Sequence, residues 1–262
     1  MTAATSWSEH PLLAERRIEF LGSPMHALSM SETLQLAEEA MSERRPLHHT
    51  VVNVSKLVNM GRNAELREDV TTADLINVDG MGVLWGARLL GCALPERVAG
   101  VDVMTNLLEL CARRGYRPYL LGAERTVLDA VLDRLRTEHP ELVVAGSRDG
   151  YFRPEQESEI VAAINASGAD CLFVAMPTPR KERFLKHHRH VLTPSFVMGV
   201  GGSFDVYGGK VARAPHMIQA LGLEWLFRVV QEPRRLWRRY YETNTAYARL
   251  LWGAFRQRQP RR

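Results

Sequence analysis

Short apolar runs rich in β-branched residues alternate along this chain with longer amphipathic stretches. The short runs end at turn-forming residues, as buried strands do, whereas apolar positions three and four apart in the longer stretches indicate helices. We expect strands at residues 18–22, 47–54, 73–78, 118–122, 142–146, 171–175 and 196–200. We expect helices at residues 31–41, with Ser31 as the cap, and at 55–62, 81–90, 103–114, 126–139, 155–167 and 182–189.

This alternation predicts an α/β fold in which a mostly parallel sheet carries helices on both faces. Ligands bind at the carboxyl ends of the strands in such sheets. The residues that follow predicted strands therefore form the candidate site: Asn53, Asp79, 177–182 and 199–205.

The composition is that of an ordinary globular protein, since 45% of the 262 residues are hydrophobic and 24% are charged. Disorder or a coiled coil over the whole chain is excluded. The three cysteines have neither a metal-type spacing nor a paired pattern, which favours a reducing compartment. The sequence shows no signal peptide and no apolar run of the roughly 20 residues that span a bilayer. We therefore expect a cytoplasmic protein.

Positive charge is concentrated towards the carboxyl end. Residues 225–262 contain ten arginines and two glutamates, a local charge of +8, although the whole chain carries only +4. Arginine is interleaved there with tryptophan, tyrosine, leucine and phenylalanine, which is typical of a helix lying in a membrane interface. Pro233 should divide this helix in two. A helix packed on its own domain and a tail that binds nucleic acid are the alternatives.

Asp79 follows an apolar strand and precedes Gly80-Met81-Gly82, where glycines let a ligand approach the backbone closely. A carboxylate in this place can act as a general base. It can equally cap the helix that follows. The residues alone leave both roles open.

Arg97 and Asp102 flank a short apolar loop. Arg97 can bind a phosphate in a forked geometry, or it can simply be solvated. Asp102 can orient a sugar hydroxyl, or it can cap the helix that starts at Val103. Both are candidates for substrate binding.

Two further loops after strands are candidates for binding phosphate. The first is a glycine-rich turn with the residues Gly199, Gly201, Gly202, Ser203 and Asp205. Backbone N–H groups in such a turn can cradle a diphosphate, although a purely structural turn has the same composition. The second loop contains Pro179, Arg180 and Lys181. Its two positive charges can neutralise a leaving nucleotide, or they can mark a charged helix start.

The sequence offers no evident ligand set for a metal. It contains no D-x-D, and the adjacent pairs His48-His49 and His187-His188 point in different directions on a strand or a helix. We therefore expect no metal and no cofactor. The charge of a leaving diphosphate would then fall to arginine, lysine and backbone donors.

Taken in order, these segments resemble the WecG/TagA/CpsF glycosyltransferases of bacterial surface-polysaccharide synthesis. The matching segments are Val51-Val52-Asn53, Asp79-Gly80-Met81-Gly82, 96–102, 199–205, Arg213-Ala214-Pro215, 221–228 and 231–235. Each segment is weak alone, but together and in this order they are specific. They span roughly residues 18–241, nearly the whole chain.

The resemblance implies a Rossmann-like α/β domain with a small C-terminal helical appendage that binds the membrane and closes over the site. We expect a flexible leader at residues 1–17, the catalytic domain at 18–220 and the appendage at 221–262. The implied reaction is an inverting, metal-independent transfer from a UDP-sugar to an undecaprenyl-diphosphate-linked sugar. It would take place at the inner face of the cytoplasmic membrane, where the appendage meets anionic lipid.

The resemblance also implies roles for single residues. Asp79 would be the catalytic base, and Asn53 would position the reacting sugars. Arg97 and the turn at 199–203 would contact phosphates. The appendage would complete the site with three arginines, which are Arg228, Arg235 and Arg238.

Two residues depart from the family pattern. Many members have threonine where this chain has Val51, and glutamine where it has Lys181. Lys181 would place a positive charge near the nucleotide or the acceptor. The donor therefore stays open between an N-acetylmannosamine-type sugar and another hexose. The oligomeric state also stays open, because an amphipathic tail packs against a second copy as readily as against a membrane.

Two other classes of protein fit the chain less well. A nucleotide-binding dehydrogenase requires a glycine fingerprint after the first strand, and that strand ends here at Gly22-Ser23-Pro24. A nucleic-acid-binding protein should carry a recognised binding motif beside its basic residues, and the tail has none. We therefore expect no nucleic-acid partner.

Overall fold

The computed structural model describes residues 6–258, apart from the side chains of His216, Ala220, Arg235 and Arg258. The strands are β1 (Arg17–Phe20), β2 (Ser23–His26), β3 (Leu47–Val52), β4 (Leu75–Val78), β5 (Pro118–Gly122), β6 (Gly146–Arg148), β7 (Cys171–Ala175) and β8 (Phe196–Gly199). The helices are α1 (Pro11–Glu15), α2 (Met30–Ser42), α3 (Val54–Arg62), α4 (Ala64–Thr71), α5 (Met81–Leu89), α6 (Gly100–Arg114), α7 (Arg125–Glu138), α8 (Glu157–Ala166), α9 (Arg180–His187), α10 (Ser203–Tyr207), α11 (His216–Ala220), α12 (Glu224–Gln231) and α13 (Pro233–Arg258).

Six strands form one parallel sheet in the order β4-β3-β8-β7-β5-β6. Every residue of β3, β4, β5, β7 and β8 is buried. Strands that are buried on both faces read as continuous apolar runs, and this is the pattern seen in the sequence. The predicted α/β fold with a C-terminal helical segment is confirmed.

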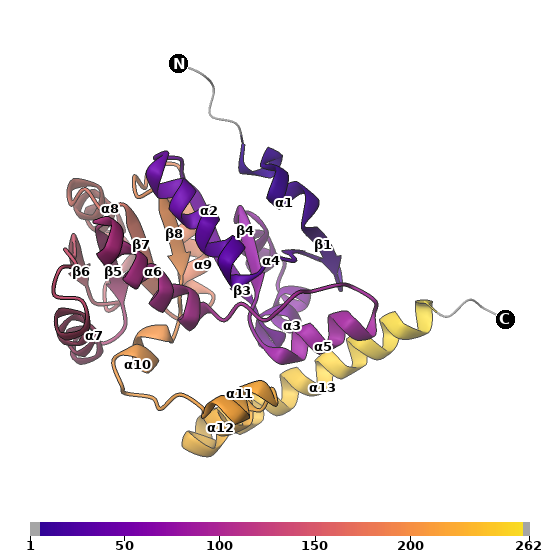
Figure 1. Cartoon of the computed structure of the whole chain (residues 1–262). Helices are drawn as coiled ribbons and strands as arrows, with labels where there is room; N and C mark the ends of the chain where they lie inside the picture. The colour runs from indigo at the N-terminus through magenta and orange to yellow at the C-terminus, as the bar shows by residue number, and fades with distance from the viewer. Residues whose placement is uncertain (1–5, 259–262) are drawn as a thin grey trace.

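Helices cover both faces of the sheet (Figure 1). On one face α2, α6, α7 and α10 pack over alternate residues of the strands, among them Phe173 and Phe196. On the other face α3, α4, α5, α8 and α9 pack over the intervening residues, such as Leu172 and Val197. The sheet is therefore the middle layer of three.

The first predicted strand lies outside this sheet. β1 pairs antiparallel with β2, and the hairpin adjoins the outer edge of β4. There the backbone N–H of Ile76 donates a hydrogen bond to Nδ1 of His26 at 3.0 Å. The His26 side chain thus accepts a hydrogen bond from a backbone N–H that would otherwise be unpaired at the edge of the sheet. The hairpin is followed by α2, whose cap is Ser29 in a capping box with Glu32, and not Ser31.

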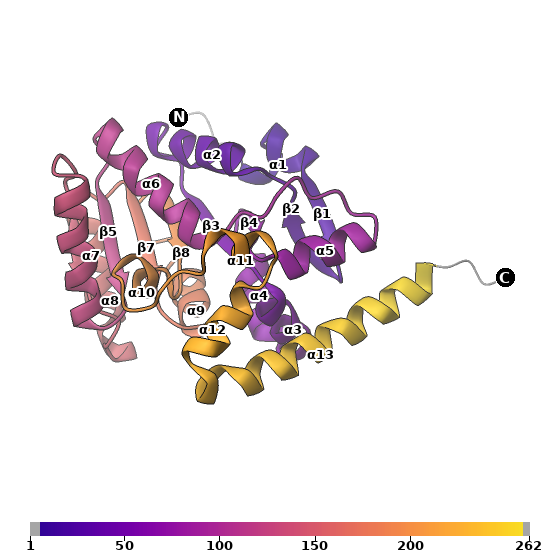
Figure 2. The same ribbon diagram turned by 60° about the horizontal axis from the view of Figure 1, so that its bottom comes forward.

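Both ends of the described chain pack on the α/β domain. From the region expected to be a leader, Trp7 is buried and donates a hydrogen bond through Nε1 to the carbonyl oxygen of Pro46 at 2.8 Å. At the other end Pro233 is the first residue of α13, a favourable place for proline. The buried residues Leu236, Thr243 and Tyr247 form one stripe of α13, and this helix runs along α3 and α5 (Figures 1 and 2).

Candidate active site

The carboxyl ends of neighbouring strands bring the predicted residues together. β3 lies between β4 and β8, and Val52 pairs with Val78, so that Asn53 and Asp79 occupy the next positions on adjacent strands. β3 leads into α3 on one face, whereas β8 leads into α10 on the other. Helices that leave adjacent strands for opposite faces open a crevice at the strand ends, where α/β proteins bind ligands.

Asp79 does not cap the following helix. Gly80 is the N-cap of α5, with a φ of 118° that favours glycine, and this cap has no side-chain hydrogen bond. The backbone N–H of Gly100 at the start of α6 instead acts on the Asp79 carboxylate and favours its charged form. The carboxylate thus interacts with a neighbouring element and is free of a capping role.

The surroundings of Asp79 raise its pKa above the usual value for aspartate. Burial of the carboxyl group is the main cause, and the negative charge of Glu224 adds to it. Arg97, Arg228 and the Gly100 N–H act in the opposite direction. A carboxylate whose pKa is raised is a better proton acceptor, as a general base requires.

Asn53 has a structural role as well as its place in the crevice. It is the N-cap of α3, and its Oδ1 accepts a hydrogen bond from the Lys56 N–H at 2.9 Å. Its Cβ lies 3.9 Å from the position that a Cβ on Gly80 would take. The exposed Asn53 therefore stands beside the turn that carries Asp79.

Arg97 and Asp102 belong to a charged cluster that joins the α/β domain to the appendage. Arg97 Nη1 lies 2.7 Å from Oε2 of Glu224, and its Nη2 donates a hydrogen bond to Gln219 Oε1 at 3.2 Å. Asp102 lies 2.5 Å from Arg213 and 3.8 Å from Arg97. Asp102 is not the cap of α6, which begins after Ala99.

Sequence reasoning did not assign site roles to Arg213, Gln219 and Glu224. Arg213 and Glu224 stand in segments that carried the family resemblance, but neither segment indicates what its charged residue contacts. Gln219 bonds to both Arg97 and Arg213. The only signal in the sequence was the presence of two acceptor side chains, Gln219 and Glu224, in the segment that follows Arg213.

The three arginines expected from the appendage do not share one environment. Arg228 on α12 is partly buried, and its charge acts on Asp79. Arg238 is exposed on α13 and pairs with Glu242 at 2.8 Å. The side chain of Arg235 lies outside the described part of the structure. Arg228 is therefore the appendage arginine that this structure brings to Asp79.

The glycine-rich turn after β8 lies at the crevice. Gly201 has a φ of 54°, and a Cβ added there would meet no atom within 4 Å, so the backbone is open to approach. Ser203 is buried and donates its hydroxyl hydrogen to the Val200 carbonyl oxygen at 2.8 Å. Gly202 precedes α10, and Asp205 stands in the first turn of that helix, with an oxygen 4.0 Å from Lys210.

The loop after β7 uses its charges internally. Arg180 donates hydrogen bonds to the carbonyl oxygens of Gly150 and Phe152 at 2.9 and 2.6 Å, which ties α9 to the loop after β6. Lys181 is buried beneath Gly199, a position for which a Cβ would lie 3.0 Å from its Cε. The neighbouring Pro179 is exposed. Neither cation of this loop presents its charge freely to the crevice.

A buried ion cluster accounts for Lys181. Its Nζ contacts the Glu182 carboxylate and donates a hydrogen bond to Thr178 Oγ1 at 3.0 Å. Lys56 Nζ lies 2.9 Å from the same carboxylate. Burial lowers the pKa of Lys181 to about 8, and the two cations lower the pKa of Glu182 to about 2 in spite of its burial. The cluster joins α3 to α9 under the site.

Apolar side chains are exposed along the appendage and on the neighbouring α5. They are Trp85, Leu89, Met217, Leu221, Leu223, Trp225, Leu226, Val230, Trp237, Tyr241, Leu250 and Trp252. Exposed arginines stand among them, including Arg234, Arg238, Arg239 and Arg249. We call these residues the arginine–aromatic surface. Apolar side chains that are exposed together and surrounded by polar residues mark a site of interaction.

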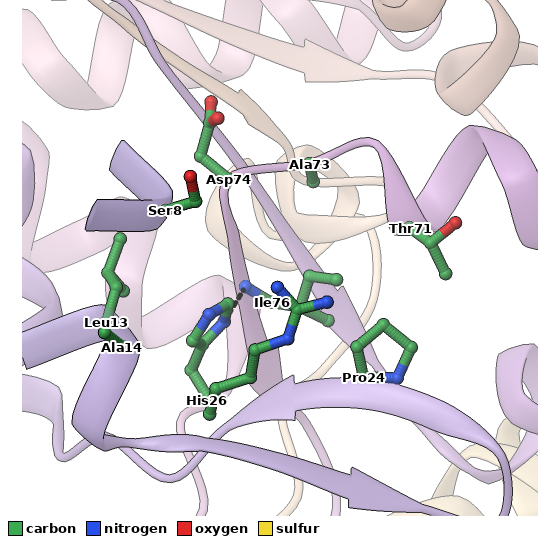
Figure 3. Close-up of a pocket in the computed structure, with 10 residues that line it drawn as sticks. Ser8, Leu13, Ala14, Pro24, His26, Thr71, Ala73, Asp74 and Ile76 are labelled. Atoms are coloured by element: carbon green, nitrogen blue, oxygen red, sulfur yellow. Dashed lines mark hydrogen bonds between the residues drawn. The ribbon is translucent and has the colours of Figure 1, made fainter. Parts of the chain in front are cut away.

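A small hollow in the described structure lies away from this site. It is a cavity of about 180 Å³ lined by residues such as Ser8, Pro24, His26 and Asp74, at the amino end of β4 (Figure 3). Burial lowers the pKa of His26 to about 4. The cavity is thus at the opposite end of the strand from Asp79.

In residues 6–258 no group of three histidine, cysteine, aspartate or glutamate residues lies close enough together to hold a metal ion. In the same span, no helix is both long and apolar enough to cross a bilayer.

Comparison with known families fits this geometry. The model of the WecG/TagA/CpsF glycosyltransferase family matches residues 18–261. The chain belongs to this family. The glycosyltransferase therefore acts in polysaccharide synthesis, and membership implies a sugar donor and a lipid-linked acceptor as its partners. The resemblance found in the sequence is confirmed over nearly the whole chain.

Proposed function

We propose that this glycosyltransferase moves a hexose, of the N-acetylmannosamine type or another, from a UDP-sugar to an undecaprenyl-diphosphate-linked acceptor. The transfer inverts the anomeric centre and needs no metal. The acceptor hydroxyl gives its proton to Asp79 while its oxygen attacks the anomeric carbon, and the bond from that carbon to the diphosphate oxygen breaks. UDP leaves with the bonding electrons. An inverting displacement of this kind needs one base and a means of stabilising the leaving diphosphate.

The observation that carries this proposal is the environment of Asp79. The carboxylate stands at the end of β4 beside Asn53, is acted on by the Gly100 N–H, and has a raised pKa. None of these features serves the capping of α5, because Gly80 has that place. A partly buried carboxylate with a perturbed pKa at the strand ends of an α/β sheet is a candidate catalytic base on physical grounds.

Positive charge for the diphosphate comes from two elements. Arg97 from the loop before α6 and Arg228 from α12 both act on Asp79 through their charges. Arginine binds phosphate through a planar fork of donors. The glycine turn at residues 199–203 offers a second place for phosphate to bind, because the backbone at Gly201 is open to approach. Asn53 and Asp102 are then the polar groups that orient sugar hydroxyls.

We propose that the arginine–aromatic surface binds the anionic inner face of the cytoplasmic membrane, where the lipid-linked acceptor lies. Tryptophan and tyrosine favour the headgroup region, and each arginine near an anionic surface contributes about 1 kcal/mol. Co-sedimentation with vesicles tests this proposal. We expect binding to anionic vesicles and weak binding to neutral ones, and Trp237→Ala with Trp252→Ala should reduce it. Equal binding to both kinds of vesicle, or to neither, would contradict it.

The reaction is tested by offering a panel of radiolabelled UDP-sugars and a short-chain polyprenyl-diphosphate-sugar acceptor, with and without EDTA. We expect transfer of one sugar, unchanged by EDTA. Absence of both transfer and UDP binding would refute the proposed reaction. Loss of transfer in EDTA that is restored by a divalent cation would refute metal independence alone.

The role of Asp79 is tested by Asp79→Asn, which keeps the size of the side chain and removes its basicity. We expect kcat to fall by about 10²-fold or more, the usual contribution of a general base. Asp133→Asn is the matched control, because Asp133 is exposed on α7 and pairs with Arg136. If Asp79→Asn and Asp133→Asn are equally active, Asp79 is not the base.

A further inference from the structure

Glu224 links the appendage to the active site through one ion pair. It is the first residue of α12, and its Oε2 lies 2.7 Å from Nη1 of Arg97, a residue 127 positions earlier in the chain. The two side chains are only 25% and 14% exposed. A charged pair that is this well shielded is screened weakly by salt, so its geometry matters to both partners.

The helix just before the appendage holds the second edge of the same guanidinium. Arg97 Nη2 donates a hydrogen bond to Gln219 Oε1 from α11, at 3.2 Å. Arg97 is thus held by one acceptor from the appendage and one from α11, which directly precedes the appendage, while Asp102 of α6 lies 3.8 Å away. The orientation of its fork depends on α11 and α12 being docked.

The charge of Glu224 reaches Asp79 as well. Four groups from three elements act on the Asp79 carboxylate beyond its burial: the Gly100 N–H at the start of α6, Arg97 from the preceding loop, and both Arg228 and Glu224 from α12. Only Glu224 among them is negative. Glu224 therefore opposes the three groups that favour the ionised carboxylate.

We propose that Glu224 is a positioning residue of this active site, which orients Arg97 beside Asp79 when α12 is docked. The carboxylate belongs to the appendage, whereas the two residues on which it acts belong to the α/β domain. Because Asp79 is the base only in the function proposed above, this role of Glu224 rests on that function. Docking of the appendage thus completes the base as well as the binding site for phosphate.

The variant Glu224→Gln tests this role, because it preserves the shape of the side chain and removes its charge. The loss of a negative neighbour lowers the pKa of Asp79, and an Arg97 released from its partner acts in the same direction. The acidic limb of the profile of kcat/KM against pH should therefore move to lower pH. On the plateau, kcat should fall about 10-fold, because a weaker base accepts the proton less well.

Three comparisons make the experiment decisive. Glu224→Asp should restore the wild-type acidic limb, whereas Glu109→Gln, a control in an exposed pair with Arg113, should change nothing. An acidic limb that does not move in Glu224→Gln, whether activity is unchanged or falls equally at every pH, would overturn the proposal. In that case Glu224 would only attach the helix.

A readout without turnover separates this proposal from the function. The carboxyl ¹³C resonance of Asp79, assigned by its absence in Asp79→Asn, reports the pKa directly. A lower pKa in Glu224→Gln than in the wild type supports the positioning role. An unchanged pKa overturns it even if transfer is observed. If the wild type transfers no sugar, the proposed function fails, and the titration still shows whether Glu224 acts on Asp79.

Discussion

Replacing Tyr247 by alanine should detach α13 from the α/β domain. Tyr247 is 7% exposed, and its hydroxyl donates a hydrogen bond to the Gly82 carbonyl oxygen at 2.9 Å. Its ring lies directly over Gly86, where any Cβ would collide with it. Gly82 and Gly86 lie one turn apart on α5 and leave the space that this side chain fills. Tyr247 is therefore the main anchor of α13 on α5.

The magnitude follows from burial. Truncating a buried aromatic residue to alanine costs about 3–5 kcal/mol, and each 1.4 kcal/mol is a factor of about ten. The docking equilibrium of the appendage should weaken by roughly two to three and a half powers of ten. Tyr247→Phe removes only the hydroxyl and leaves the Gly82 carbonyl without that partner, which costs about 1 kcal/mol.

Hydrogen exchange over residues 236–250, measured beside sugar transfer, checks this prediction. In Tyr247→Ala we expect faster exchange in α13, unchanged exchange in the central strands, and a loss of kcat/KM, because Arg228 and Glu224 leave Asp79. The matched control is Gln257→Ala, since Gln257 is exposed on the same helix and lies outside the arginine–aromatic surface. Normal protection of α13 and normal kcat/KM in Tyr247→Ala would refute the view that docking completes the site.

Two further predictions concern stability. Trp7→Ala removes a buried ring and its hydrogen bond to Pro46, so the free energy of unfolding in urea should fall by about 3–5 kcal/mol, whereas no change would mean that the region before β1 is a loose leader. Burial lowers the pKa of His26, His48 and His49 from 6.5 to about 4, 3 and 4. Below pH 6.5 the unfolded chain binds protons that the folded chain does not, so the urea midpoint should fall as the pH drops from about 6.5 towards 4. A constant midpoint over that range would contradict the buried neutral state of these histidines.

The parallel sheet could be predicted because its signal is local. The buried strands are continuous apolar runs, and the helices between them have their own periodicity, so the order of elements follows from the sequence. Residues 142–146 show the limit of this reasoning. They were predicted as a strand, but only Gly146–Arg148 pair with β5, and Leu142, Val143 and Val144 precede the strand with partly exposed side chains. Leu142 and Val144 contact the edge of the core and Val143 is exposed, so none of the three has a place in the sheet.

Elements whose partners are distant could not be predicted. β2 was not expected, because Ser23–His26 contains proline and polar residues that form a strand only against β1. The helix α4 was not expected either. Trp7 stands in a polar region, and only its contact with the loop before β3 makes it part of the core. These features depend on tertiary contacts that override local propensity.

The candidate site also contains residues whose placement follows from the sequence and residues whose placement depends on tertiary contacts. Asn53, Asp79 and the turn at 199–203 could be placed together from the sequence, since parallel strands end at one edge of the sheet. The roles of Arg180 and Lys181 could not, because a cation after a strand looks the same whether it faces a substrate or a buried carboxylate. The Lys181–Glu182–Lys56 cluster shows that here the charge is balanced inside the protein. The lysine that stands at position 181, where many family members have glutamine, is therefore paired with the Glu182 carboxylate.

The division of the site between two parts of the chain has a consequence for its chemistry. The α/β domain supplies Asp79 and Arg97, and the appendage supplies Glu224 and Arg228, one charge of each sign close to the base. When α12 is docked these two charges oppose each other at Asp79, so that burial decides the direction in which its pKa moves. When α12 leaves, the crevice opens to water and burial, the largest cause of the shift, is reduced. The same helices carry the arginine–aromatic surface proposed to bind lipid. A membrane that stabilised the docked appendage would thus raise the basicity of Asp79 where the acceptor lies.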